Sequence, residues 1–175
     1  AYAKLMEWET VMSLAEKEDP EFMFIHCSYI VIAKRAILSG RKDVAERALE
    51  AAIKGIEKQD SYSEFYAELL REIADIFLSI GNNAMAVHLL NKAIEHLSVK
   101  KNVDPPLYIG FLADIGISWI KTGDNSKGMR LLHEAFEDIV TLENAFQKRE
   151  ALSRIGKAYI DTNMAIKETE RVILK

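Results

Sequence analysis

The feature that most constrains the fold is a set of helix-ending residues that recur at nearly equal intervals along the chain. Gly40, Gly81, Gly123 and Asn163 are separated by 41, 42 and 40 residues. Glycine, and at some cost asparagine, adopts the left-handed backbone conformation that commonly follows the last turn of a helix. Between these stops, apolar residues recur at intervals of three and four, with little alternation of period two. The sequence therefore predicts an all-α protein built from structural repeats.

Side-chain size repeats together with the stops. A small residue lies seven positions before each stop, and a second residue, aromatic in three copies, lies four before it: Ala33 and Ala36, Ala74 and Phe77, Gly116 and Trp119, Gly156 and Tyr159. After the first three stops come a small residue at five, leucine at nine and alanine at twelve positions: Ala45, Leu49 and Ala52; Ala86, Leu90 and Ala93; Gly128, Leu132 and Ala135. The fourth copy departs from this, with Glu168 and Lys175. Because antiparallel helices approach closely only where side chains are small, each repeat is predicted to be a tight helix pair.

This spacing of small residues resembles the tetratricopeptide repeat (TPR) family, from about residue 21 to the C-terminus. The resemblance rests on three registered sets: Ala33, Gly40, Ala45 and Ala52; Ala74, Gly81, Ala86 and Ala93; Gly116, Gly123, Gly128 and Ala135. It implies a right-handed α-α superhelix, a TPR-like solenoid of antiparallel pairs with about nine helices. The family's usual period is 34 and its closing proline is missing here, so each helix is expected to be about one turn longer. HEAT and armadillo repeats have the right length but fit the glycine turn and alanine spacing less well.

We expect a single TPR-like domain over residues 1–175. An orphan helix over 1–18 resembles the second half of a preceding repeat, and helix pairs follow over 20–58, 61–98, 105–140 and 143–175. Asp19 with Pro20, Asp60 with Ser61, and Asp104 with Pro105 are typical of helix starts. The longest connection, 99–104, is interpreted as a bend rather than a domain boundary.

Three first helices differ in how much of their surface is apolar. "EFMFIHCSYIVIAKRAIL" (21–38) and "LYIGFLADIGISWIK" (107–121) offer few polar residues, so both are predicted to be interior helices. "NAFQKREALSRIGKAYID" (144–161) has a clear polar face and resembles a cap; that face consists of Gln147, Lys148, Glu150, Arg154, Lys157 and Asp161.

Composition narrows the class of partner. The net charge of −4 gives no basic footprint for nucleic acid. No apolar run reaches the roughly 18 residues that would span a bilayer, and no segment is typical of a signal peptide. Cys27 is the only cysteine, so no internal disulfide can form and a reducing compartment is favoured. We therefore expect a cytoplasmic protein with neither nucleic acid nor membrane as its partner.

The segment "KTGDNSKGMRLL" (121–132) has the outline of a phosphate-binding loop. Its Gly123 and Gly128 align with Gly40 and Ala45 of the first repeat, however, so the second glycine is not required by the repeat. A phosphate loop would follow a buried strand and continue with lysine and serine or threonine, whereas Met129 and Arg130 follow here. The segment is predicted to be the corner between two helices.

No other residues form a catalytic or metal-binding set. His26 and Cys27 are adjacent, and neighbours on a helix point about 100° apart, so they cannot act as a base and nucleophile pair; Cys27 is predicted to be a small buried hydrophobe. His88, His96 and His133 lack the spacing of metal ligands. Glu68, Glu72 and Asp75 share a helix face with Arg71, which favours a solvated or ligand-facing stripe over an acid–base pair. We expect no catalytic residue, cofactor or metal.

In the TPR family, the first helix of each pair lines a concave groove. By this resemblance, four residues of each first helix should point into the groove: those one and four positions after its small residue, and those three and six positions before it. Cys27, six positions before Ala33, is one of them. The predicted groove wall consists of Ile30, Lys34, Ile37, Glu68, Arg71, Asp75, Leu78, Ala113, Ile117, Lys121, Glu150, Ser153 and Lys157. Ile30, Ile37 and Ile117 could equally pack between repeats. The lysine and asparagine arrangement with which some family members clamp a terminal carboxylate is absent, so chaperone C-termini are not favoured.

Two functions follow from this reading. The first is a non-enzymatic protein-protein interaction scaffold that binds a peptide or helix of another protein in the concave groove. The alternative is a self-association module, in which the orphan first helix or the C-terminal "ERVILK" completes the solenoid of a neighbouring chain and gives a homo-oligomer. An enzyme is the least favoured class, because fold alone does not decide function and no catalytic set is present.

Overall fold

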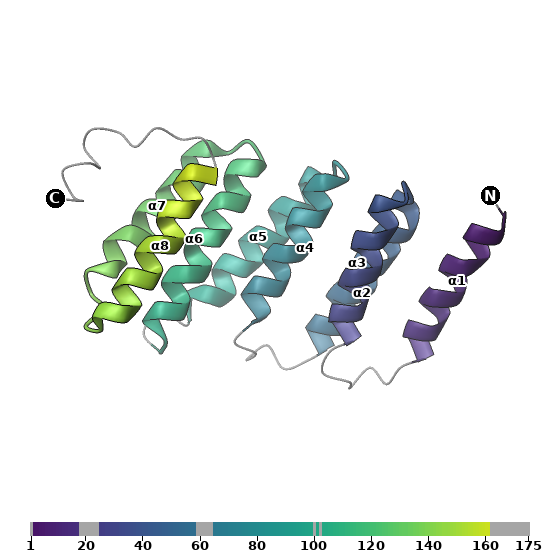
Figure 1. Ribbon diagram of the computed structural model, residues 1–175, viewed down its shortest axis with the longest axis horizontal. Coiled ribbons are helices and arrows are strands. Elements are labelled where there is room, and N and C mark those ends of the chain that lie inside the picture. The colour runs from purple at the N-terminus through teal and green to yellow at the C-terminus, as the bar shows by residue number, and fades with distance from the viewer. Residues whose placement is uncertain (1, 18–24, 59–64, 100, 102, 162–175) are drawn as a thin grey trace. The chain divides into compact units, whose positions relative to one another are not determined.

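The computed structural model describes residues 2–17, 25–58, 65–99, 101 and 103–161. These residues form eight α-helices and no strand (Figure 1), so the described chain is all-helical, as predicted. The helices are α1 (Tyr2–Lys17), α2 (Ile25–Leu38), α3 (Lys42–Lys58), α4 (Tyr66–Ser79), α5 (Asn83–Ser98), α6 (Pro105–Lys121), α7 (Asn125–Ile139) and α8 (Ala145–Asp161). The ninth predicted helix, which would follow Asn163, lies outside the described residues, as do the predicted helix starts at Asp19 and Asp60.

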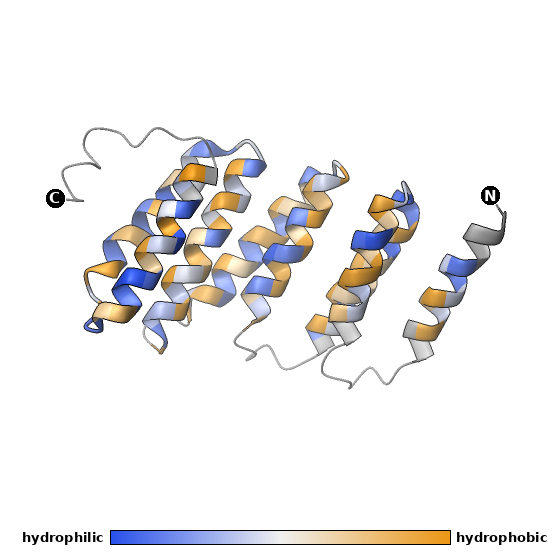
Figure 2. Cartoon of the chain, viewed as in Figure 1, coloured by the Kyte–Doolittle hydropathy of each residue, from blue (hydrophilic) through white to orange (hydrophobic). Residues whose placement is uncertain are grey.

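The chain divides into two compact units, residues 1–86 and 87–175. Unit 1 holds α1 to α4 and the first residues of α5, and unit 2 holds the rest of α5 with α6, α7 and α8. The division falls within α5. The helices carry both hydrophobic and hydrophilic residues along their length (Figure 2), as helices with one buried and one solvated face do.

Three predicted glycine turns are confirmed. Gly40, Gly81 and Gly123 have φ angles of 72°, 87° and 95°, the left-handed conformation that favours glycine. In the first two turns the residue after the glycine donates back to the helix: Arg41 N to Ala36 O at 2.8 Å, and Asn82 N to Phe77 O at 2.9 Å. These bonds satisfy carbonyl groups that a helix end leaves without partners. The fourth predicted turn, at Asn163, lies outside the described residues.

The predicted small positions of the first three repeats are buried, as the helix-pair interpretation requires, whereas Gly156 of the fourth repeat is exposed. Ala33, Ala45, Ala52, Ala74, Ala86, Ala93 and Ala135 all have 0% exposure. At the crossing of α6 and α7, a Cβ at Gly128 would lie 2.6 Å from the carbonyl oxygen of Gly116. Only glycine allows two helix backbones to come so near, so the identity of these residues sets the crossing.

The two helices predicted to be interior, α2 and α6, differ in how much of their surface is buried. In α6 every residue from 108 to 113 is buried, and the same holds for Trp119, so that prediction is confirmed. In α2, however, Val31 and Leu38 are 58% and 80% exposed, and the prediction for this helix is wrong. The helices that contact α2 within unit 1, namely α1, α3 and α4, leave the side with these two residues uncovered.

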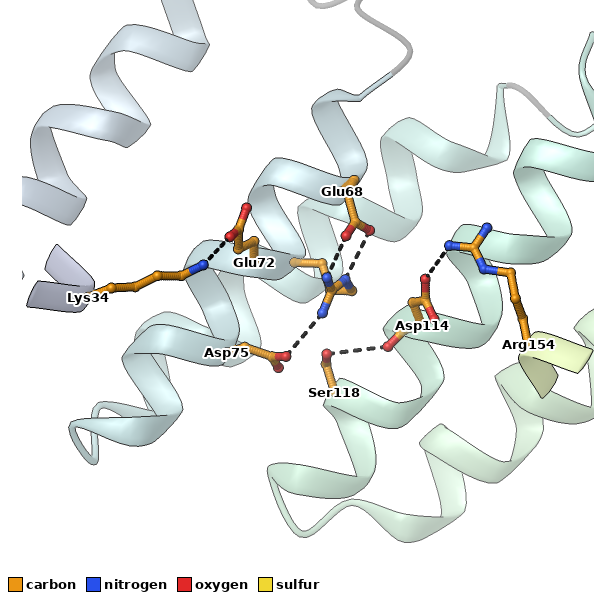
Figure 3. A network of polar contacts seen from close by, with 8 residues as sticks. Lys34, Glu68, Glu72, Asp75, Asp114, Ser118 and Arg154 are labelled. Atoms are coloured by element: carbon orange, nitrogen blue, oxygen red, sulfur yellow. Dashed lines mark hydrogen bonds and ion pairs between the residues drawn. The ribbon is translucent and has the colours of Figure 1, made fainter. Parts of the chain in front are cut away.

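In unit 2, α8 packs on α6 and α7 through Ala151 and Ile155, both buried. Beside them, Arg154 lies over Gly110 of α6, where a Cβ would come within 2.4 Å of its Nη1 atom. The same guanidinium donates from Nη2 to Asp114 Oδ2 at 2.8 Å (Figure 3). Gly110 therefore provides the space in which the arginine lies.

A polar cluster fixes the start of α6. Asp104 caps the helix by accepting from Leu107 N at 3.1 Å, as the Asp-Pro pattern predicted. Tyr108 donates to Glu134 Oε1 of α7 at 2.7 Å, and Lys101 Nζ lies 2.8 Å from Asp138 Oδ2. Burial, followed by the bond to Glu134, raises the pKa of Tyr108 well above its usual value, so this hydroxyl remains a donor.

Candidate functional site

A hollow of about 490 Å³ lies between α2 and α4 in unit 1. Its lining from α2 comes from positions one helical turn apart, and its lining from α4 comes from one face of that helix. The lining residues are Lys34, Ile37, Leu38, Arg71, Glu72, Asp75, Ile76 and Ser79. The volume lies within the roughly 300–1,000 Å³ of sites that accept small molecules or anchoring side chains. This hollow is the candidate functional site.

One ion pair joins the two helices at the hollow. Lys34 Nζ donates to Glu72 Oε1 at 2.5 Å (Figure 3). The residues are 38 positions apart, and each belongs to the first helix of its repeat. Because both side chains are partly exposed, we expect the pair to contribute at most about 1 kcal/mol to stability. The pair neutralises both charges at the hollow.

The second cation of the hollow, Arg71, is held by carboxylates of its own helix. It donates from Nε and Nη2 to the two oxygens of Glu68, at 3.0 and 2.5 Å, and from Nη1 to Asp75 Oδ2 at 3.0 Å. These residues lie three and four positions from Arg71, where neighbours on a helix meet. A two-pronged arginine–carboxylate contact is among the stronger charge-assisted geometries. Arg71 is therefore held along α4.

The apolar part of the hollow is graded from buried to exposed. Ile76 is buried, Ile37 is half-buried and Leu38 is largely exposed. Val31, seven residues before Leu38, adds a second exposed aliphatic side chain on the same side of α2. Exposed aliphatic residues next to a concave surface are typical of interaction sites.

The thiol of Cys27, which does not line the hollow, is less buried than predicted. Cys27 is half-buried, and burial, with a smaller contribution from the charge of Glu72, raises the pKa of its thiol. A thiol with a raised pKa is a poor nucleophile. Among the described residues, no group of three or more histidine, cysteine, aspartate or glutamate side chains could hold a metal ion.

The loop with the outline of a phosphate site is a helix–helix turn, as predicted. Asp124 caps α7 by accepting from Lys127 N at 2.9 Å. Lys127 Nζ lies 3.6 Å from the centre of the Trp119 ring and donates to Asn91 Oδ1 at 2.7 Å. Burial, and then the charge of Arg130, lowers the pKa of this lysine. Its ammonium group is thus directed to a cation–π contact and an amide.

The structure brings part of the predicted groove wall together. Lys34, Ile37, Arg71 and Asp75 line the hollow, and Glu68 binds Arg71 beside it. Ile30 and Ala113 are buried in their units. The remaining predicted residues are half-buried (Leu78 and Ile117) or exposed (Lys121, Glu150, Ser153 and Lys157).

The predicted groove wall omitted four lining residues, of which Glu72 had been placed only in the polar stripe beside Arg71: Leu38, Glu72, Ile76 and Ser79. The sequence contains a pattern that could have placed Glu72 at a contact between helices. It lies nine positions before its stop, and the aligned residues of the next two repeats are Asp114 and Arg154, which form an ion pair with each other. A charged residue at this position therefore marks contacts between successive first helices.

Comparison with solved structures finds a similar fold in Ton1535 from Thermococcus onnurineus NA1, with a TM-score of 0.66 and 18% sequence identity. The match covers 88% of this chain and 42% of the Ton1535 chain, so this chain spans less than half of that protein. At such identity the likeness concerns the fold alone. No protein-family model matches the chain, and a comparison with curated proteins gives no match either. None of the described helices is long and apolar enough to cross a membrane.

Proposed function

We propose that the chain is a non-enzymatic protein-interaction scaffold of the TPR-like kind, and that the hollow between α2 and α4 binds a peptide or helix of a partner protein. The observation that carries this proposal is a concave surface of about 490 Å³ on two successive first helices, lined by aliphatic side chains and by charges of both signs. The three left-handed glycine turns and the buried small residues support the right-handed solenoid that the TPR resemblance implies.

The chemistry of the hollow indicates which part of a partner would provide affinity. Lys34 is paired with Glu72, and Arg71 with Glu68 and Asp75. A charged peptide would have to replace these contacts, with little net gain. Leu38 and, to a smaller extent, Ile37 can instead bury apolar surface against a partner, at roughly 25 cal/mol per Å². The proposed ligand is therefore a segment with aliphatic anchors, whose binding depends only weakly on salt.

The remaining properties belong to the same proposal. Cys27 is the only cysteine of the sequence, so no internal disulfide can form, which fits a reducing compartment such as the cytoplasm. The charge balance gives no reason to propose nucleic acid as a partner.

A peptide-display selection against the wild-type protein, counter-selected with Leu38→Glu, tests this function. Selected peptides should carry aliphatic residues spaced three or four apart, and should perturb the NMR amide signals of α2 and α4. Leu38→Glu should weaken binding at least tenfold, because it places a charge against the apolar anchor. The matched control is Val140→Glu, which alters an equally exposed aliphatic residue at the end of α7.

Two results would contradict the proposal. One is selection of peptides that bind Leu38→Glu as well as wild type. The other is selection of peptides whose NMR perturbations lie away from α2 and α4.

A further inference from the structure

The ion pair between Lys34 and Glu72, here called the bridging pair, retains hydrogen-bonding capacity on both of its members. The Lys34 ammonium has three N–H donors, and the structure gives it one acceptor, Glu72 Oε1. The second carboxylate oxygen, Oε2, accepts no hydrogen bond from the described residues (Figure 3). The two side chains are 52% and 32% exposed, so a ligand can reach them. Donors and an acceptor are therefore available side by side at the hollow.

The other polar side chains of the hollow have partners within their own helix. Arg71 donates to both oxygens of Glu68 and, through Nη1, to Asp75. The hydroxyl of Ser79 donates to the carbonyl oxygen of Ile76 at 2.7 Å. These contacts lie along α4, whereas the bridging pair joins α4 to α2. The bridging pair is thus the polar contact that a ligand between the two helices would meet.

The bridging pair lies one helical turn from the aliphatic lining on both helices. Lys34 precedes Leu38 by four residues, and Glu72 precedes Ile76 by four, which is about 6 Å at 1.5 Å per residue. Side chains three or four apart on a ligand helix are separated by a similar distance, about 5–6 Å between Cβ atoms. A partner helix that lies along the hollow therefore places one side chain on the aliphatic lining and another, one turn away, at the bridging pair.

The bridging pair determines which chemistry suits that second side chain. An apolar group would remove water from the Lys34 donors and from Glu72 Oε2 without replacing its hydrogen bonds, which is costly. A carboxylate would lie against Glu72 and an ammonium group against Lys34, and each contact joins like charges. A carboxamide carries an acceptor oxygen and a donor NH2 group without net charge. It can therefore satisfy both members of the pair at once.

We propose that the hollow recognises a helix that carries asparagine or glutamine three or four residues from an aliphatic anchor. This inference rests on the proposed function, because it concerns the same hollow and the same kind of anchor. The carboxamide oxygen accepts from Lys34 and the NH2 group donates to Glu72, while the aliphatic residue packs on Leu38. The ion pair stays intact, so neither charge loses its partner on binding. Specificity comes from the amide, since a ligand without it leaves polar groups of the site unpaired.

Calorimetric titration of the full chain with synthetic peptides from the display selection tests the amide. Peptides that the hollow selects should share an asparagine or glutamine three or four residues from an aliphatic residue. Each is compared with two variants, in which alanine or the acid of the same shape, aspartate or glutamate, replaces the amide. Alanine should weaken binding to the wild-type protein at least tenfold, because the bridging pair loses its hydrogen bonds to the ligand. The acid should weaken binding as well, because it lies against Glu72.

Two protein variants place the amide at the bridging pair. Glu72→Leu leaves Lys34 as a lone charge, so the ranking should reverse and the acid peptide should bind more tightly than the amide peptide. Exchange of the pair, Lys34→Glu with Glu72→Lys, should keep the affinity for the amide peptide within about threefold, because a carboxamide can turn over and exchange its donor and acceptor. The matched control is Asp114→Leu, which removes the aligned carboxylate of unit 2 and its bond to Arg154 and should leave all three peptide affinities unchanged.

Three results would overturn this inference while the proposed function stands. The first is a set of peptides that lose affinity for Leu38→Glu but share no amide. The second is an alanine peptide that binds the wild-type protein as tightly as the amide peptide. The third is the same ranking of amide and acid peptides on Glu72→Leu as on wild type. Peptides that bind Leu38→Glu as well as wild type would contradict the proposed function itself, and the inference with it.

Discussion

Two pairs of successive first helices, α2 with α4 and α6 with α8, are joined by the same kind of contact but leave different surfaces. In unit 1, Lys34 of the earlier helix binds Glu72 of the later one, and a hollow remains beside the pair. In unit 2 the charges are exchanged, because the earlier helix provides Asp114 and the later one Arg154. There the arginine lies directly over Gly110.

The residue aligned with Gly110 explains part of this difference. In α2 it is Cys27, so α2 has a side chain at the position where α6 has none, and the residue aligned with Arg154 is Glu72 rather than an arginine. Unit 1 also has its arginine, Arg71, bound along α4 by Glu68 and Asp75, so that it stays on its own helix. The two contacts thus differ in one side chain of the earlier helix and in the charge of the residue that the later helix provides. Repeats of the same architecture can therefore leave a hollow beside one inter-helix contact and fill the corresponding space at another.

The largest loss of stability is expected from a substitution at the glycine crossing of α6 and α7 in unit 2. Gly128→Ala adds a Cβ within 2.6 Å of the Gly116 carbonyl and 2.5 Å of Ile120 Cγ1, so α6 and α7 must move apart. Overpacking of this kind costs about 1–3 kcal/mol. Chemical denaturation followed by circular dichroism measures the loss.

The matched control is the same substitution at an open glycine. Gly156→Ala meets no described atom, so removal of glycine from a helix should stabilise the protein by about 0.5–1 kcal/mol. Equal effects of the two substitutions would show that the α6–α7 crossing does not depend on glycine.

A smaller effect is expected from Gly110→Ala, which makes α6 resemble α2 at the aligned position. The new Cβ would displace the Arg154 guanidinium and break its bond to Asp114. Stability should change by less than about 1 kcal/mol, because loss of a partly exposed ion pair is offset by the better helix propensity of alanine. The Nε–H signal of Arg154 in NMR spectra should shift toward that of a solvated arginine. An unchanged signal would show that the arginine does not need the space at Gly110.

The same comparison shows which features of the structure could be predicted from the sequence. Turns at Gly40, Gly81 and Gly123 and the burial of the small alanines follow from local rules, because one residue type satisfies each requirement. The hollow does not follow from such rules. The Lys34–Glu72 pair joins residues 38 apart, whereas the repeat period is about 41, so it depends on how far one helix is displaced along its neighbour. The exposure of Val31 and Leu38 was missed for the same reason, since apolar composition alone does not say which side of α2 its neighbours cover.

The smallest expected effect concerns the turns, where unit 1 has a charge pair that unit 2 lacks. Arg41 Nη2 donates to Asp43 Oδ2 at 2.6 Å, and this bond is the main reason that the pKa of Asp43 is lowered to about 2. The residue aligned with Asp43 in the third repeat is Ser126, which carries no charge. A pKa lowered by folding gives stability that is present above the unfolded value, near 4, and is lost as the pH falls toward 2. NMR titration should therefore find Asp43 still ionised at pH 3, and Arg41→Ala should return its pKa toward the ordinary value. Because Asp43 is exposed to solvent, the accompanying change in stability should be slight and should shrink further as salt screens the pair. A titration midpoint near 4 in the wild-type protein would mean that Arg41 does not hold this carboxylate in solution.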